Sequence, residues 1–322
     1  MFTFRALRRI SPRSALPMTV LSAALLAATA CGGGSEAGSG SGTRVIAGFY
    51  PMAWLSEQVG GTAVSVDTLA RPGAEPHDLE LSPRQIAELG EADLVVYVKG
   101  LQPAVDQAVS ERAKDRGLDA ASAVRTLPPP AEGEHGHEHE DEHGHGHDEG
   151  SYDPHIWLDP SRMATIATAL GERLAKADPA NAAAYRAGAR TVAGRLTALD
   201  GEFQAGLKNC ERRTMVTAHA AFGYLADRYG LEQVPIAGVD PTAEPSPQRL
   251  AELTHEIREN GATTVFTETL VSPKVAQALA REAGVRTATL DPVEGLADGS
   301  RDDYVSIMRK NLQTLRTALD CA

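Results

Sequence analysis

Short β-rich runs alternate with longer stretches of helical spacing along most of the chain. Several stretches of helical spacing open with a serine followed by a proline, as at Ser82-Pro83, Ser246-Pro247 and Ser272-Pro273, which is a start signal for a helix. The predicted strands are residues 44–49, 64–69, 93–98, 214–217, 234–236, 263–267 and 285–290. This alternation predicts an α/β fold with parallel sheets covered by helices.

One stretch is much longer than the others. Residues 180–207 carry apolar side chains at near-helical spacing and contain no proline. A helix of about 28 residues is roughly 42 Å long, which is enough to span two lobes. We therefore predict an N-terminal lobe at 44–179, a linker helix at 180–208 and a C-terminal lobe at 209–322.

The first 43 residues have the pattern of an export signal. Four arginines precede an apolar run at 16–30, which is too short to span a bilayer. A small residue followed by Cys31 closes the run and resembles a lipobox, although Ala28 stands where a large aliphatic residue is usual. We predict a signal peptide at 1–30, a lipidated Cys31, and a Gly/Ser tether at 31–43 that holds the protein on the outer face of the cytoplasmic membrane. An ordinary secretory peptide with an incidental cysteine is the alternative.

Composition narrows the choice of partners. The formal charge of −12 argues against nucleic acid and anionic lipid, although much of the acid lies in one run. The two remaining cysteines, Cys210 and Cys321, predict one disulfide in an exported chain. The chain has no phosphate-binding motif of the kind that hydrolyses ATP. We expect a monomer.

Residues 131–150 form a histidine-rich acidic run with almost no apolar side chain, so we expect it to be disordered. His-rich tracts bind metal, which predicts a metal-collecting loop, with a solvated linker as the alternative. Its H-E-x-x-H match at 139–143 lies among glycines and acids, where the helix that a metalloprotease needs is not expected. The six candidate metal-capturing side chains are His135, His137, His139, His143, His145 and His147.

Four side chains follow predicted strands or enter predicted helices. They are His77, His155, His219 and Asp291. Ligands of open α/β sheets bind beyond the carboxyl ends of the strands, so we expect the four to meet in a cleft between the lobes. Three imidazoles and one carboxylate form a closed tetrahedral shell that suits Zn²⁺ better than Mn²⁺. Each histidine could instead be a turn or cap residue, and Asp291 could belong to an Asp-Pro turn.

Glu268 ends a predicted strand and is the reserve ligand. We expect it rather to cap a helix or to accept a hydrogen bond from a ligand histidine.

The chain resembles the metal-specific solute-binding lipoproteins of bacterial ABC importers, over nearly all of its mature length. The acidic His-rich run and His219 are similar to the zinc-specific branch. The resemblance implies two small α/β lobes joined by one rigid helix, His77, His155 and His219 as ligands, and Asp291 as the fourth ligand or a neighbour of a bound water. It also implies delivery of Zn²⁺ to a permease with its ATPase. The motifs that carry it are Pro76-His77-Asp78, residues 153–157 (DPHIW), 217–224 (TAHAAFGY), 241–245 (PTAEP), 265–268 (VFTE) and 289–292 (TLDP).

Two other functions stay open from the sequence. An extracytoplasmic zinc hydrolase would need an open coordination position and a general base such as Glu268. A surface adhesin or metal-buffering protein would need no transporter.

Overall fold

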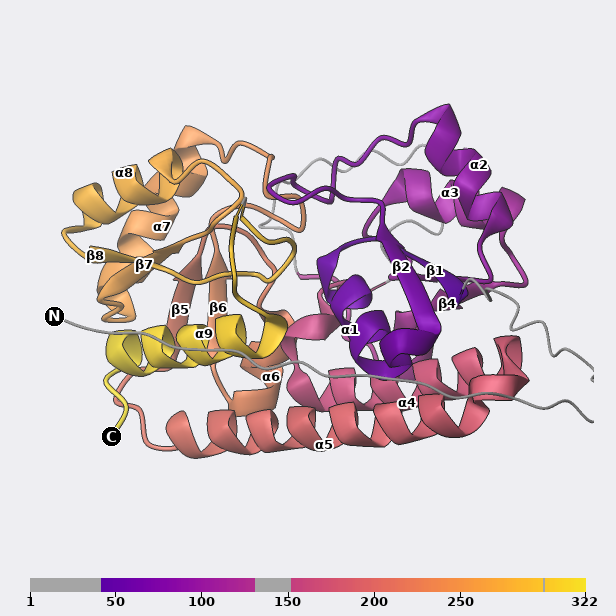
Figure 1. Cartoon of the computed structure of the whole chain (residues 1–322). Helices are drawn as coiled ribbons and strands as arrows, with labels where there is room; N and C mark the ends of the chain where they lie inside the picture. The colour runs from indigo at the N-terminus through magenta and orange to yellow at the C-terminus, as the bar shows by residue number, and fades with distance from the viewer. Residues whose placement is uncertain (1–41, 131–151, 298) are drawn as a thin grey trace, which may run out of the picture. The chain divides into compact units, whose positions relative to one another are not determined.

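The computed structural model describes residues 42–130, 152–297 and 299–322, and contains two four-stranded sheets (Figure 1). All strand pairs within both sheets are parallel, which confirms the predicted α/β class. The first sheet has the order β2-β1-β3-β4 and the second the order β6-β5-β7-β8. The strands are β1 (Thr43–Ala47), β2 (Val64–Thr68), β3 (Leu94–Tyr97), β4 (Gly117–Asp119), β5 (Thr214–Thr217), β6 (Glu232–Pro235), β7 (Thr264–Thr267) and β8 (Arg286–Thr289).

Helices flank each sheet. Two of the predicted serine N-caps are confirmed. The side chain of Ser82 accepts a hydrogen bond from the backbone N–H of Gln85, and that of Ser246 accepts one from the backbone N–H of Arg249. The third signal was wrong, because α8 has Pro273 at its N-cap position and no side-chain cap. The helices outside the long pair are α1 (Tyr50–Gly60), α2 (Pro83–Glu91), α3 (Pro103–Arg112), α6 (Gly223–Tyr229), α7 (Pro247–Glu259), α8 (Lys274–Ala283) and α9 (Tyr304–Leu319).

The predicted long helix is present as α5 (Ala182–Gly206), a continuous helix of 25 residues. It packs along α4 (Pro160–Ala177), and Figure 1 shows the two side by side. It also contacts α1, which follows the first strand, and α9, which ends the chain. Asp200 accepts hydrogen bonds from Arg228 and Tyr229 of α6, at 2.9 and 3.1 Å to one carboxylate oxygen. The helix is therefore bound to elements from both halves of the sequence.

Alternate residues of each strand face different apolar clusters, as the pleat of a β-strand requires. Val45 and Met215 point into one large cluster that also includes residues of α5, whereas Ile46 and Val216 point into smaller clusters on the other faces. The large cluster contains side chains from both sheets, so the two halves share one continuous core. This restricts how far the halves can move against each other.

The predicted disulfide joins Cys210 to Cys321 across 111 residues of sequence and is confirmed. It ties the segment between α5 and β5 to the end of the chain. Among the described residues, none of the helices is both long and apolar enough to cross a bilayer.

Two glycines of α5 make a matched test of its packing against α1. A side chain at Gly188 would collide with the carbonyl group of Val59, whereas a side chain at Gly194 would meet nothing within 4 Å. We expect Gly188→Ala to cost about 1–3 kcal/mol of stability through overpacking. We expect Gly194→Ala to gain up to about 1 kcal/mol of helix propensity. Thermal unfolding checks both: shifts of the same sign would contradict the packing described here.

Candidate metal centre

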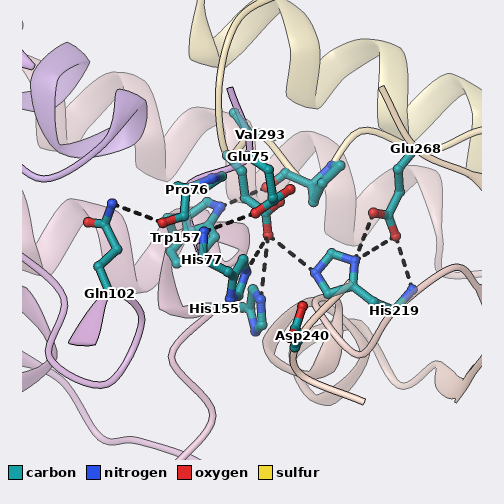
Figure 2. Close-up of polar contacts among 12 residues, drawn as sticks. Glu75, Pro76, His77, Gln102, His155, Trp157, His219, Asp240, Glu268 and Val293 are labelled. Atoms are coloured by element: carbon teal, nitrogen blue, oxygen red, sulfur yellow. Dashed lines mark hydrogen bonds and ion pairs between the residues drawn. The ribbon is translucent and has the colours of Figure 1, made fainter. Parts of the chain in front are cut away.

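Three imidazoles and one carboxylate converge at the carboxyl ends of the strands. One ligand-type atom from each of His77, His155, His219 and Glu294 lies within 4.8 Å of the others. The Nε2 atoms of the three histidines lie 3.3, 3.5 and 3.2 Å from the same oxygen, Oε1 of Glu294. Figure 2 shows the three labelled histidine rings gathered around one point, where the dashed lines from them meet. His155 and His219 are completely buried, and Glu294 is 1% exposed.

These distances suit a tetrahedral ion. Zn²⁺ binds imidazole nitrogen at about 2.0–2.1 Å, so tetrahedral ligands lie about 3.3 Å from one another. The observed nitrogen–oxygen separations of 3.2 to 3.5 Å span that value. The distances from the carboxylate oxygen to the three nitrogens are therefore those of a four-ligand shell, and all four atoms lie within 4.8 Å of one another.

Asp153 fixes the orientation of His155. The carboxylate Oδ1 of Asp153 lies 2.7 Å from Nδ1 of His155 and accepts its backbone N–H at 3.0 Å. A carboxylate beside Nδ1 places the imidazole proton there, which leaves the lone pair on Nε2. His155 thus presents a metal-binding nitrogen to the cluster.

Glu268 does the same for His219, which follows β5. One oxygen of Glu268 lies 2.7 Å from Nδ1 of His219 and accepts its backbone N–H at 3.1 Å. Glu268 lies behind the ring, on the side away from Glu294, in the hydrogen-bonding position that we preferred from the sequence.

Two side chains fix the main chain at His77, in the loop after β2. The backbone N–H of His77 donates to Glu75 Oε1 at 3.0 Å, and the side chain of Gln102 donates to the carbonyl of the preceding Pro76 at 3.2 Å. Figure 2 shows Gln102 reaching Pro76 from the side opposite the cluster.

The electrostatics favour a positive charge at the centre of the cluster. Burial alone would lower the pKa of His219, but Glu268 and Glu294 raise it to about 10. Burial acts to raise the pKa of Glu294, yet the three imidazoles hold it well below its ordinary value. The Nε2 atoms of His155 and His219 both face Oε1 of Glu294. If these nitrogens carry lone pairs, the buried arrangement requires protons or a cation to be stable.

Comparison with known proteins places this geometry in a family. The family model described as zinc-uptake complex component A, periplasmic (ZnuA), matches residues 45–318. The chain belongs to the ZnuA family. This is a family of zinc-uptake components, and it includes the zinc-specific proteins that the sequence resembles.

Individual ZnuA-family proteins are similar over most of the chain. The high-affinity zinc uptake system protein ZnuA of Bacillus subtilis is 35% identical over 312 residues, covering 93% of this chain and 96% of its own. The zinc-binding protein AdcA of Streptococcus pyogenes serotype M6 is 37% identical over 87% of this chain, which spans only 56% of AdcA. The crystal structure of the Zn(II)-bound ZnuA-like domain of Streptococcus pneumoniae AdcA has a TM-score of 0.72 and 31% identity, and covers 87% of this chain and 99% of that one.

The structure does not bring Asp291 into the cluster, and Glu294 occupies the place that we predicted for it. The carboxylate of Asp291 accepts the N–H of Val293 at 2.7 Å instead, and burial raises its pKa to about 6. Val293 has a φ of 58°, which is uncommon for a β-branched residue. The resulting tight turn directs Glu294 inward, so the carboxylate three residues further along the chain reaches the histidines.

The turn that carries Glu294 is also fixed to the segment that carries His155. The indole N–H of Trp157 donates to the carbonyl of Pro292 at 2.7 Å, and the hydroxyl of Tyr304 donates to the carbonyl of Trp157 at 2.5 Å. The carboxylate is therefore positioned by both the turn and its neighbours.

Several predicted site residues lie outside the described residues. Their roles in lipid attachment and metal capture stay predictions. They are Cys31, His135, His137, His139, His143, His145 and His147.

Two carboxyl-to-amide substitutions separate the two candidate acids. Glu294→Gln removes the charged ligand, and we expect Zn²⁺ affinity to fall by at least about tenfold. Asp291→Asn keeps an oxygen that can accept the N–H of Val293, so we expect an affinity within about threefold of the parent. Competition with a chromophoric chelator measures both. A larger loss in Asp291→Asn than in Glu294→Gln would restore Asp291 as the ligand.

Proposed function

We propose that this protein captures Zn²⁺ outside the cytoplasm and delivers it to an ABC-type permease that works with its ATPase. The observation that carries the proposal is the approach of three imidazole nitrogens to one buried carboxylate oxygen, at 3.2 to 3.5 Å. The ligands are His77, His155, His219 and Glu294, with Asp153 and Glu268 orienting two of the rings. Membership of a zinc-uptake family and the name of the Bacillus subtilis relative, a high-affinity zinc uptake system protein, support the same cargo.

The donor set favours zinc over manganese. Three nitrogens and one oxygen in a tetrahedral arrangement suit Zn²⁺, whereas Mn²⁺ prefers more oxygen ligands and a larger coordination number. The full burial of His155 and His219 also limits the room for additional water ligands.

Binding rather than catalysis is the use that the geometry favours. Four protein ligands close a tetrahedral shell, whereas catalytic zinc sites keep one position for water or substrate. The general base that a hydrolase would need is also occupied, because both oxygens of Glu268 lie within 2.8 Å of Nδ1 of His219, on the far side of the ring.

The cellular setting follows from the export signal. We propose that Cys31 is lipidated and that the protein functions as a monomer at the outer face of the cytoplasmic membrane. The lobes are residues 44–179 and 209–322, joined by the helix at 180–208, and the cation lies between them. The names of the two curated relatives given above refer to zinc binding and zinc uptake, and support transport. A matching solved structure of a Streptococcus agalactiae protein is described as having both adhesin and metal-transporting activity, so metal transport is the activity that these relatives share.

Two histidine variants test the cargo site. We expect His155→Ala to weaken the tightest Zn²⁺ site by more than about 100-fold, because a buried ligand is removed. His255→Ala is the matched control, since His255 is exposed on α7 and lies 3.1 Å from Glu259. Chelator competition is measured on the full chain and on a chain lacking residues 131–150. An unchanged tight site in His155→Ala would refute the proposal.

Cobalt substitution separates a binding protein from a hydrolase. We expect one equivalent of Co²⁺ to give the intense visible absorption of a tetrahedral N3O site, with no water in exchange with solvent. Absorption spectroscopy and water proton relaxation make the measurement. An exchangeable water on the metal would favour the enzyme.

A further inference from the structure

A buried tyrosine connects the segments that carry two of the three histidines. Tyr224 lies in α6 and is fully buried. Its hydroxyl donates to the carbonyl of Asp153 at 2.6 Å and accepts the N–H of Leu127 at 3.0 Å. One hydroxyl therefore joins α6 to two points of the chain that are distant in sequence.

Those two points also bind each other. The N–H of Asp153 donates to the carbonyl of Leu127 at 3.0 Å. The main chain of Asp153 is thus held at both its N–H and its carbonyl group, which leaves the side chain directed at Nδ1 of His155, 2.7 Å away. A shift of this main chain would move the carboxylate that orients the ring.

The residue before Tyr224 confines the same carboxylate. A Cβ atom at Gly223 would lie 2.6 Å from Oδ2 of Asp153, so only glycine lets the start of α6 approach this closely. The guanidinium of Arg162 lies over the Tyr224 ring, 4.7 Å from the ring centroid. The ring and its hydroxyl are fixed by packing as well as by hydrogen bonds.

The start of α6 is itself anchored beside His219. The carbonyl of His219 accepts hydrogen bonds from Thr217 Oγ1 at 2.7 Å and from Gln233 Nε2 at 2.9 Å. Tyr224 follows only five residues later. The segment that carries one imidazole therefore reaches across to fix the orienting group of another.

We propose that Tyr224 is a positioning residue of the metal site: its hydroxyl holds the main chain of Asp153 so that His155 stays aligned with His219. This inference rests on the proposed function of the cluster as a Zn²⁺ site. The effect of Tyr224 on the metal passes through Asp153 and His155.

Tyr224→Phe removes the hydroxyl and keeps the ring that packs against Arg162. We expect Zn²⁺ affinity to fall by about tenfold, the lower end of the range for groups that orient a ligand, mainly through faster dissociation. The matched control is Tyr229→Phe in the same helix, which loses a hydrogen bond to Asp200 at 3.1 Å and should bind Zn²⁺ as the parent does. Gly223→Ala, which presses on the same carboxylate, should weaken binding at least as much as Tyr224→Phe.

Two further readouts distinguish alignment from general destabilisation. The visible spectrum of the Co²⁺ form should change in Tyr224→Phe and not in Tyr229→Phe, even where both variants lose similar thermal stability. In an Asp153→Ala background, Tyr224→Phe should have little further effect on Zn²⁺ affinity, because its route to the metal is already removed.

Equal Zn²⁺ affinities and unchanged Co²⁺ spectra in Tyr224→Phe and the parent would overturn the positioning role. So would equal losses in Tyr224→Phe and Tyr229→Phe. The parent and His155→Ala proteins are measured alongside. If His155→Ala keeps the tight site, the cargo site itself is wrong, whereas loss in His155→Ala without loss in Tyr224→Phe removes only the positioning role.

Discussion

The convergence of three imidazole nitrogens on one buried carboxylate oxygen is the constraint on which the rest of the structure depends. Such a cluster is unfavourable without positive charge, because lone pairs and an anionic oxygen lie together away from water. Two further acids lie behind the rings: Asp153 touches Nδ1 of His155, and Glu268 touches Nδ1 of His219. They fix the tautomers and add negative charge, so the site is organised to hold a cation.

The fold brings these groups together by repeating one arrangement. In each sheet the first strand in sequence lies between the second and the third, in the orders β2-β1-β3-β4 and β6-β5-β7-β8. His77 follows β2, His219 follows β5, and the turn that carries Glu294 follows β8. A shared core and α5 connect the halves, so the ligands need little rearrangement to meet one cation. Trp157 donates a hydrogen bond to the carbonyl of Pro292, and Tyr224 donates one to the carbonyl of Asp153. These bonds fix the turn before Glu294 and the segment before His155.

Much of this arrangement was predictable from the sequence because it depends on local patterns. Strand and helix alternation predicted the parallel sheets, and proline-free helical spacing predicted the long helix. The positions of the three histidines, after strands or in a loop that enters a helix, predicted their meeting. The short strand β4 was missed, since Gly117–Asp119 carries no run of β-branched residues. Glu294 was missed because the turn at Val293, with a positive φ, brings Glu294 rather than Asp291 to the histidines. A single sequence gives no clear signal for a valine in that conformation. Asp291, the first acid after the predicted strand, was therefore chosen as the ligand.

The most direct test of the account is a crystal structure of the zinc-loaded protein with anomalous scattering recorded at the zinc edge. The account predicts one strong peak bound at about 2.0–2.2 Å by Nε2 of His77, His155 and His219 and by Oε1 of Glu294, in tetrahedral geometry. A tightly bound zinc located elsewhere, or one whose shell lacks Glu294 and is completed by Asp291 or by exchangeable water, would contradict it.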